Sequence, residues 1–190
     1  MTPELLETIK FVAATVSPLL AGYVGVWYGL KQIRVTKRLD FIEKQLRDFY
    51  SMLLGIRKEI EAKSELRPRI QAKSTEVWQE ECKTGTQNIE MVHKEIEYDN
   101  RQFKEELFPL YKRMLEIFRE NYWLAEPETA KCYSELAEYV EVWKRYYAGS
   151  IEGETVRKLG HTEERLRPFY AELEYRTKIL RSELSKGGEK

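Results

Sequence analysis

Apolar residues recur along most of the chain with the spacing of α-helices. Between residues 35 and 60 they alternate in steps of four and three, which keeps them on one face of a helix. The seam formed in this way consists of Val35, Leu39, Ile42, Leu46, Phe49, Leu53, Ile56 and Ile60. Further faces of helical period follow over residues 89–117, 133–147 and 166–184, and strand patterns are almost absent. The pattern therefore predicts an all-α protein.

A run without charged residues precedes the seam. Residues 11–30 hold no Asp, Glu, Lys or Arg, and as a helix rising about 1.5 Å per residue they would span roughly the 30 Å hydrocarbon core of a bilayer. The basic start and the small-residue cleavage site of a secretory signal peptide are missing. Trp27 and Tyr28 stand where interfacial aromatic residues lie. We predict a transmembrane helix over residues 11–30.

Small residues recur every four positions inside this run. They are Ser17, Ala21, Gly25 and Gly29. A stripe of this kind lets two membrane helices approach closely, and the seam begins soon after it in the same predicted helix. The two patterns together predict a parallel homo-oligomer, most simply a dimer. The alternative is that the stripe only reflects the usual composition of membrane helices.

Basic residues follow the run closely. They are Lys31, Arg34, Lys37 and Arg38, whereas only Lys10 precedes the run. Because basic residues resist translocation, we expect the N-terminus outside the cell membrane and the body in the cytoplasm. Residues 1–38 carry a net charge of +3 and residues 39–190 carry −3, which argues against nucleic-acid binding. The basic cluster is instead expected to contact lipid headgroups.

The body is expected to be a cytoplasmic, antiparallel helical bundle with long helices that resemble those of coiled coils. The predicted divisions are a short N-terminal tail (1–10), a transmembrane helix (11–30), a juxtamembrane heptad helix (31–62), the remainder of the bundle (63–185) and a disordered tail (186–190). Pro68 is expected near the end of the juxtamembrane helix, and Pro109 is expected to kink or break a later one. Residues 83–88 are either a turn or a weak part of one helix. Residues 150–161 are expected to form a loop before an N-cap at Thr162.

Catalytic signatures are missing from the sequence. It contains no glycine-rich phosphate loop, no HExxH motif and no serine elbow. His93 and His161 stand near carboxylates, but without further ligands they are interpreted as ordinary surface or helix-end histidines. Cys82 and Cys132 are interpreted as reduced thiols. We therefore assign no catalytic residue, no metal and no cofactor.

Aromatic residues gather in two places that could form one ligand pocket. They are Tyr122, Trp123, Trp143, Tyr146 and Tyr147. Tyrosine and tryptophan combine apolar faces with polar edges, which suits a pocket. An ordinary core between two helices is the simpler interpretation.

Three segments share a local pattern. They read "LRDFYSML" (46–53), "LFPLYKRM" (107–114) and "LRPFYAEL" (166–173). Their common offsets of three, four and seven lie on one helix face. Convergent core packing is favoured over a true repeat, which would need similarity across longer units.

One resemblance extends across much of the chain. The segments "QLRDFYSMLLGIRKE" and "FPLYKRMLEIFRENYWLAEPETAKCYSELAEYVEVWKRYYAGSIEG", behind a single anchor, resemble small bacterial single-pass membrane-anchored helical proteins of unassigned function. Some proteins of this build look linked to phage defence. The resemblance covers the anchor, the first body helix and roughly residues 106–153, leaves residues 62–101 unmatched, and carries no known active site.

These observations predict a non-enzymatic, membrane-tethered helical protein that acts through protein–protein association, as a scaffold, sensor or effector subunit. Its expected partners are membrane lipids, a second copy of itself and an unidentified protein. One alternative is an oligomeric effector that perturbs membranes or forms pores, in antiviral defence for example. A second alternative is an enzyme with a pocket in the aromatic region.

Overall fold

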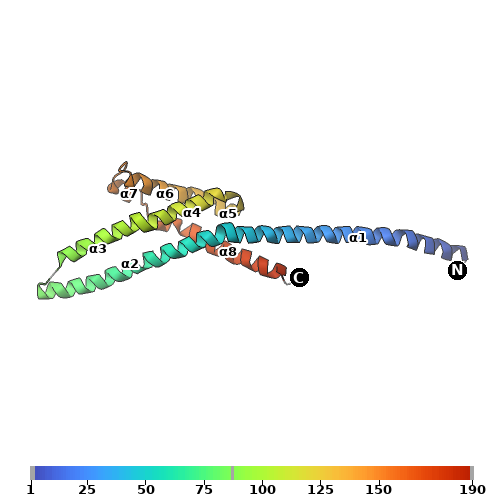
Figure 1. Cartoon of the computed structure of the whole chain (residues 1–190), viewed down its shortest axis with the longest axis horizontal. Helices are drawn as coiled ribbons and strands as arrows, with labels where there is room; N and C mark the ends of the chain where they lie inside the picture. The colour runs from blue at the N-terminus through green and yellow to red at the C-terminus, as the bar shows by residue number, and fades with distance from the viewer. Residues whose placement is uncertain (1–2, 87, 189–190) are drawn as a thin grey trace. The chain divides into compact units, whose positions relative to one another are not determined.

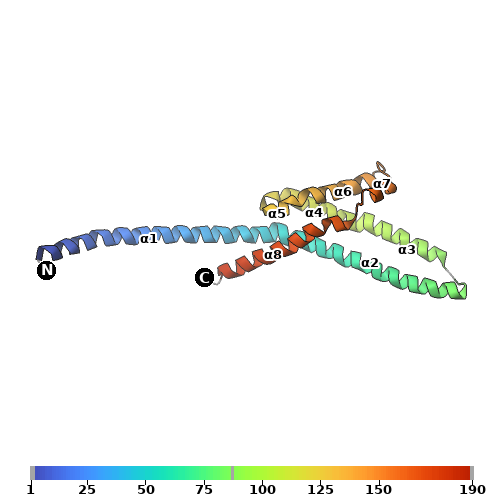
Figure 2. The same ribbon diagram turned by 180° about the vertical axis from the view of Figure 1, so that it is seen from behind.

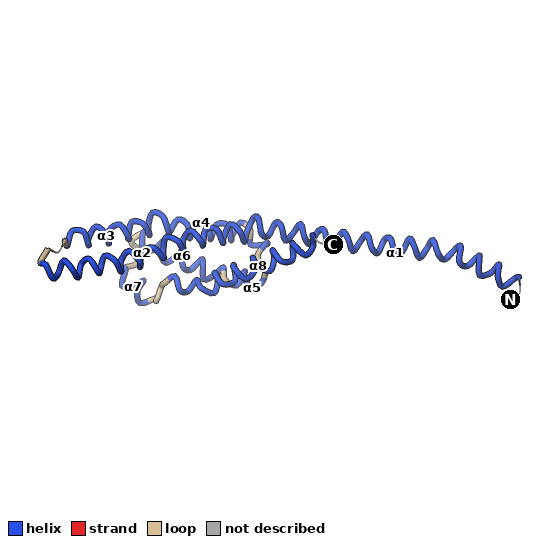
Figure 3. The backbone as a smooth tube through the Cα atoms, turned by 90° about the horizontal axis from the view of Figure 1, so that it is seen from below, coloured by secondary structure: helices blue, strands red, loops and turns tan. Residues whose placement is uncertain are grey.

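The computed structural model describes residues 3–86 and 88–188, and the side chains of residues 22–86 and 88–187. About 90% of the chain is helical, and no strand occurs among the residues described (Figures 1 and 3). The predicted all-α fold is confirmed. The chain divides into two compact units, one of Met1–Glu43 with Glu183–Lys190 and one of Lys44–Ser182.

The first unit consists of most of helix α1 (Pro3–Gln45) and the C-terminal end of helix α8 (Arg167–Gly188). Arg38 forms an ion pair with Glu183 at 3.3 Å, and a side chain added at position 187 would require the Leu39 side chain to shift. Helix α8 includes residues 186–188, which were predicted to be disordered; residues 189 and 190 lie outside the description.

The membrane-spanning prediction falls in α1. Among the side chains that the structure describes, no helix is long and apolar enough to cross a bilayer. Residues 11–21 of the predicted span, including Ser17 and Ala21, lie outside those described side chains.

The second unit contains the rest of the elements. In chain order these are η1 (Leu46–Tyr50), α2 (Ser51–Thr84), α3 (Ile89–Gln102), η2 (Phe103–Leu107), α4 (Phe108–Glu120), η3 (Tyr122–Leu124), α5 (Pro127–Lys131), α6 (Tyr133–Tyr147), α7 (Gly153–Lys158), η4 (Glu163–Leu166) and α8. Helix α4 packs against α2 and α6, and this packing forms the middle of the unit.

Helices α2 and α3 form an antiparallel hairpin (Figure 2). Helix α2 ends at Gly85, whose φ of +71° is left-handed, and Asn88 caps α3 by accepting a hydrogen bond from the Met91 N–H at 3.1 Å. One continuous helix is therefore not formed here, because α2 ends at Thr84 and α3 begins at Ile89. The expectation that Pro68 ends its helix is wrong: α2 continues through this exposed proline, which removes one backbone hydrogen bond from a helix of 34 residues.

The seam supplies much of the core. Its members from Ile42 onward are buried, apart from the half-buried Ile56, whereas Val35 is exposed and Leu39 is half-buried. In the second unit the Phe49 ring lies 5.1 Å from the Phe118 ring, and that ring lies 5.8 Å from Phe169. This part of the seam is therefore occupied within one chain and does not face a second copy.

The three similar segments all contribute to this core. The positions that the segments share, at offsets of zero, three, four and seven, are buried, except for Leu110, which is half-buried. Convergent packing accounts for the pattern, since the shared offsets mark positions that face the same interior.

Two π-helical turns interrupt the long helices. Element η1 joins α1 to α2, and η2 joins α3 to α4. The expected break at Pro109 does not occur. In η2 the Phe108 N–H bonds to the Phe103 carbonyl, five residues back, and this wider turn accommodates a proline that has no N–H of its own.

The last helices follow the predicted order with two differences. Pro127 begins α5 as expected, and α6 ends at Tyr147, before Gly149 with its φ of +70°. The predicted loop over 150–161 contains the short helix α7. Thr162 precedes a 3₁₀ turn, and its side chain makes no capping hydrogen bond.

Candidate functional site

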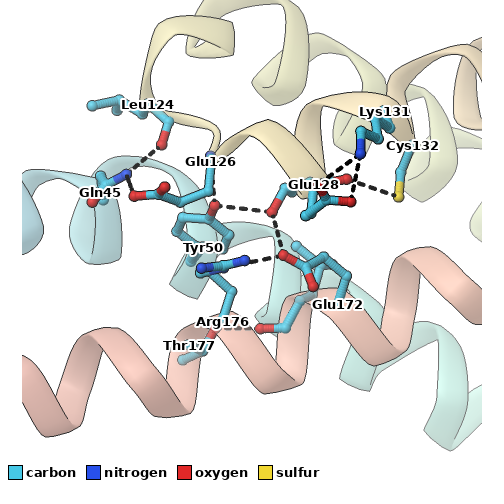
Figure 4. A network of polar contacts seen from close by, with 12 residues as sticks. Gln45, Tyr50, Leu124, Glu126, Glu128, Lys131, Cys132, Glu172, Arg176 and Thr177 are labelled. Carbon is cyan, nitrogen blue, oxygen red and sulfur yellow. Dashed lines mark hydrogen bonds and ion pairs between the residues drawn. The ribbon is translucent and has the colours of Figure 1, made fainter.

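A chain of hydrogen bonds joins η1, the start of α5 and α8 (Figure 4). The Glu126 N–H donates to the Tyr50 hydroxyl at 2.9 Å. The oxygen of this Tyr50 hydroxyl lies 3.0 Å from the Thr129 hydroxyl oxygen. Thr129 in turn donates to Glu172 at 2.9 Å. A carboxylate can only accept, so Thr129 must receive its own hydrogen bond from Tyr50.

Neighbouring contacts complete this chain. Arg176 donates to the same Glu172 oxygen at 3.1 Å, and Gln45 donates to the Leu124 carbonyl at 2.8 Å. Tyr50 and Thr129 are fully buried. Since the hydroxyl groups already have their partners, we interpret the network as a structural connection and not as a binding site.

A cavity of about 1040 Å³ opens beside α6. Its aromatic wall consists of Phe103, Tyr111, Tyr139, Trp143, Tyr146 and Tyr147, and the remaining wall comes from α2, α3, α7 and the residues around His161. Ligand-binding clefts have a volume of about 300–1000 Å³ and mainly aromatic or apolar walls with a few polar groups. The cavity is about as large as the largest of these clefts and has one aromatic wall, but more than half of its lining residues are polar or charged.

The aromatic wall is held by ring-to-ring contacts. The Trp143 ring lies 4.6 Å from Phe103 and stacks on Tyr147 at 6.1 Å between centroids. Tyr139 stacks on His161 at 4.8 Å. These contacts hold the rings of the wall against one another.

The structure separates the five aromatic residues of the predicted pocket. Trp143, Tyr146 and Tyr147 line the cavity, whereas Tyr122 and Trp123 are not among its lining residues. Tyr122 contacts Tyr133 at 5.7 Å, and the exposed Trp123 lies under the Lys44 ammonium at 4.8 Å. A pocket that combines all five is therefore not formed.

His161 differs from the sequence interpretation, because it is only 5% exposed. Its Nε2 lies 3.1 Å from the Tyr139 carbonyl oxygen, and burial lowers the pKa of the imidazole. Its Nδ1 is buried without a hydrogen-bond partner in the part of the chain that the structure describes. Nothing in the local sequence distinguishes His161, since its burial depends on residues of α6.

Trp143 also presents a buried polar atom without a partner. Its Nε1 makes no hydrogen bond among the described residues, although the indole lies near enough to Tyr139 to favour ionisation of that hydroxyl slightly. The Trp143 and His161 ring centroids are 5.8 Å apart. The two rings thus lie close together behind the cavity wall, with both polar atoms buried.

The hydroxyl groups of three buried tyrosines, Tyr111, Tyr139 and Tyr170, lie near Glu163. Burial raises the pKa of Tyr139 to about 12 and raises the pKa of Tyr111 and Tyr170 as well. These hydroxyls remain protonated at neutral pH, and Tyr170 donates to Glu163 at 3.2 Å. They are suited to hydrogen bonding and not to acting as bases.

Three of the seven charged residues that line the cavity form ion pairs. Arg67 bonds to Asp99 at 2.6 Å, and Lys63 bonds to Glu106 at 3.0 Å. The lining residues include four basic and three acidic side chains. Because these charges nearly cancel, the cavity does not favour a strongly charged ligand.

A second concavity, of about 870 Å³, lies between α2 and α3. We call residues 63–104 the hairpin arm. Its apolar side chains remain largely exposed, namely Leu66, Ile70, Val77, Ile89, Met91, Val92, Ile96 and Tyr98, with exposed fractions between 36% and 63%. Leu66, Ile70, Val77, Met91 and Val92 line the groove. Contiguous exposed apolar surface of this kind marks interaction sites.

Charge is divided along the hairpin arm. The tip half, residues 74–97, holds six acidic and two basic residues, a net charge of −4. The base half, residues 63–73 and 98–104, holds six basic and two acidic residues, a net charge of +4. The arm is therefore self-complementary when a second copy approaches head to tail.

The remaining predicted positions lie on α1. Added side chains at Gly25 or Gly29 would meet nothing within 4 Å in a single chain. Lys31, Arg34, Lys37 and Arg38 are exposed, with Lys31 5.8 Å from the Trp27 ring and Arg38 paired with Glu183. These positions are accessible, and their contacts with lipid or a second copy stay predictions.

No group of three or more potential ligands could hold a metal ion within the described residues, and both cysteines are free. Comparison with known proteins finds no matching family model, no similar curated protein and no similar solved structure. The resemblance to membrane-anchored helical proteins therefore stays a prediction, and function must be argued from the two concavities.

Proposed function

We propose that the protein is a non-enzymatic, membrane-tethered protein that associates with a second copy through its hairpin arm. The exposed apolar groove between α2 and α3 carries this proposal. A helical hairpin that buries its apolar face against another hairpin completes a four-helix bundle, which is a stable way to cover such a face.

The size of the arm suits this partner. Residues 63–84 of α2 extend about 33 Å, and two adjacent helices are roughly 20 Å wide. The face therefore offers roughly 650 Å² per copy, or about 1300 Å² in a dimer, which lies within the range of about 1200–2000 Å² for stable interfaces.

The charge distribution favours an antiparallel arrangement. It brings the acidic tip half of each copy onto the basic base half of the other, whereas a parallel arrangement brings like charges together. This contact is separate from the parallel pairing predicted for the Ser17–Gly29 stripe, because the two use different parts of the chain.

The tether in this proposal is the uncharged run over residues 11–30, with the N-terminus outside and the body in the cytoplasm. Protease added to intact cells should leave the body uncut, and cell lysis should expose it. Recovery of the full chain in the soluble fraction, or digestion of the body in intact cells, would contradict this part of the proposal.

Charge reversal tests the arm. A tip variant, Glu80→Lys with Glu95→Lys, and a base variant, Arg69→Glu with Lys73→Glu, each bring the altered half to a net charge of zero and so remove the attraction across an antiparallel interface. Each variant should dimerise weakly alone, but the two should form a heterodimer when mixed, since the unaltered basic half of the tip variant then meets the unaltered acidic half of the base variant. Analytical ultracentrifugation of the full chain in detergent measures this.

The control for charge reversal is a pair of substitutions outside the arm, Glu141→Lys with Lys144→Glu on the exposed face of α6, which should leave the dimer intact. A monomeric wild-type chain, or tip and base variants that fail to combine, would show that the groove serves another partner or none.

Cysteine crosslinking tests the orientation. Cys82 is exposed in the tip half, and Glu65→Cys in a Cys132→Ser background places a second thiol in the base half. An antiparallel dimer should crosslink residue 65 of one copy to Cys82 of the other. Crosslinks that join only 65 to 65 and 82 to 82 would indicate a parallel dimer instead.

A further inference from the structure

The part of the uncharged run whose side chains are described, residues 22–30, is exposed. Its large apolar side chains are between 50% and 72% exposed, namely Tyr23, Val24, Val26, Trp27, Tyr28 and Leu30. At about 100° per residue these positions extend over more than half of the helix surface, and Gly22, Gly25 and Gly29 share the remainder. Apolar surface of this extent suits lipid chains, as the proposed tether requires.

Basic residues form one face of α1 directly after this run. We call Lys31, Arg34, Lys37 and Arg38 the basic face, because at about 100° per residue they fall within about a third of the helix circumference. All four are exposed. Arg38 lies about 12 Å along the helix from Leu30, close to the Debye length of roughly 8–10 Å. The next acidic residues, Asp40 and Glu43, lie about 15 and 20 Å from Leu30, so the basic face is the charge nearest to the end of the run.

Only one member of the basic face has a counter-charge among the described side chains. Arg38 forms its ion pair with Glu183 of α8 at 3.3 Å, whereas no described carboxylate forms an ion pair with Lys31, Arg34 or Lys37. The Lys31 ammonium instead lies 5.8 Å from the Trp27 ring centroid, and both residue types are typical of the membrane interface. Three positive charges are therefore left for an anion outside the chain.

We propose that the basic face binds the headgroups of anionic phospholipids, and that Glu183 competes with these headgroups for Arg38. This contact rests on the membrane tether proposed above and adds the class of lipid that the tether selects. Each basic residue near an anionic surface contributes about fivefold in affinity, the equivalent of about 1 kcal/mol. A zwitterionic headgroup carries its own cation beside the phosphate and gives little net attraction.

Native mass spectrometry of the full chain in detergent counts the lipids that stay bound and so tests the lipid class. The probes are dioleoyl phosphatidylglycerol and dioleoyl phosphatidylcholine, which share their acyl chains and differ in net charge. Phosphatidylglycerol should bind at least tenfold tighter. Lys31→Gln with Arg34→Gln should weaken phosphatidylglycerol at least fivefold and leave phosphatidylcholine unchanged. The control, Lys112→Gln with Arg113→Gln, removes two exposed positive charges from α4 and should change neither affinity.

Glu183→Gln tests the competition. It frees Arg38 and should tighten phosphatidylglycerol about two- to fivefold, the range expected for an exposed ion pair. Its matched control is Glu174→Gln, which removes a carboxylate paired with Lys58 from the same helix and should have little effect. Unchanged or weaker binding by Glu183→Gln, or an equal gain by both variants, would overturn the competition.

Two results separate the lipid class from the tether itself. A chain that stays in the membrane fraction but binds the two lipids equally, or loses as much phosphatidylglycerol in the α4 control as in the α1 variant, would overturn the basic face alone. A chain recovered in the soluble fraction would overturn the tether and, with it, this contact.

Discussion

Tyr50→Phe is the sharpest test of the hydrogen-bond chain in Figure 4. The change removes one oxygen from a fully buried side chain and keeps the ring in place. The Glu126 N–H then loses its acceptor, which costs about 1–3 kcal/mol for a buried donor. Thr129 still donates to Glu172 and loses only an ordinary hydrogen bond of about 1 kcal/mol.

We therefore expect the free energy of unfolding to fall by about 2–4 kcal/mol. For a body of this size, each kcal/mol corresponds to about 3 °C in melting temperature, so the loss should be about 6–12 °C. Urea unfolding followed by circular dichroism measures the free energy directly. Tyr175→Phe is the matched control, because that hydroxyl is on a side chain 59% exposed and should change stability by less than about 0.5 kcal/mol.

A double variant provides a second measurement, because Tyr50 and Thr129 are successive members of the same chain of hydrogen bonds. Thr129→Val removes the next hydroxyl, so the double variant should cost less than the sum of the two single variants. A Tyr50→Phe protein as stable as the wild type, or strictly additive losses, would refute the view that these groups act as one connected network.

Three further predictions concern other parts of the chain. Burial lowers the pKa of His161, so the contribution of this residue to stability should be complete above its unfolded pKa of 6.5 and lost as pH falls through the lower folded pKa. Between pH 7 and pH 5, urea unfolding should show a steeper loss of the free energy of unfolding for the wild type than for His161→Gln. The control variant His93→Gln should behave as the wild type. Pro68→Ala should stabilise α2 by about 1–3 kcal/mol because it restores a hydrogen bond inside the helix, whereas Pro127→Ala in the first turn of α5 should have little effect; equal effects in thermal melts would contradict this. Gly25→Leu with Gly29→Leu should weaken a membrane crosslink through a cysteine at position 32 without changing the circular dichroism of the body, and an unchanged crosslink would mean that the stripe does not pack.

The helices of the core were predictable because their pattern is local. Leu46, Phe49 and Leu53 share one face in any α-helix, and the structure buries all three. The pattern alone did not tell which surface would cover that face, since a second copy and helix α4 offer similar apolar partners. Only the three-dimensional packing of Phe49 on Phe118 decides between them.

The hairpin arm was harder to predict. Residues 70–81 have a weak apolar period, and their apolar residues Ile70 and Val77 are exposed, so sequence periodicity did not show that α2 continues to Thr84. Pro68 also gave a misleading stop signal, because a proline weakens a helix without always ending it.

The candidate cavity was predictable only in part. Trp143, Tyr146 and Tyr147 share one helix and line the cavity together, but Tyr122 and Trp123 belong to a turn elsewhere. His161 could not be identified, since it is 22 residues from the carbonyl that it contacts. Long-range partners of this kind leave no local signature in one sequence.

The length of the π turn η2 determines how the apolar face of α3 is oriented relative to the buried face of α4. A π turn holds one more residue than the α-helical turn it replaces, and each residue turns a helix by about 100°. Deletion of a single residue from Phe103–Leu107 would therefore rotate the apolar positions of α3 by that angle relative to the buried face of α4. Most substitutions adjust a surface gradually, but a change in length here would redirect the apolar face of α3 and move Phe103 from the cavity wall in one step. Insertions and deletions at this turn are thus a route by which such a chain could exchange one partner for another during evolution.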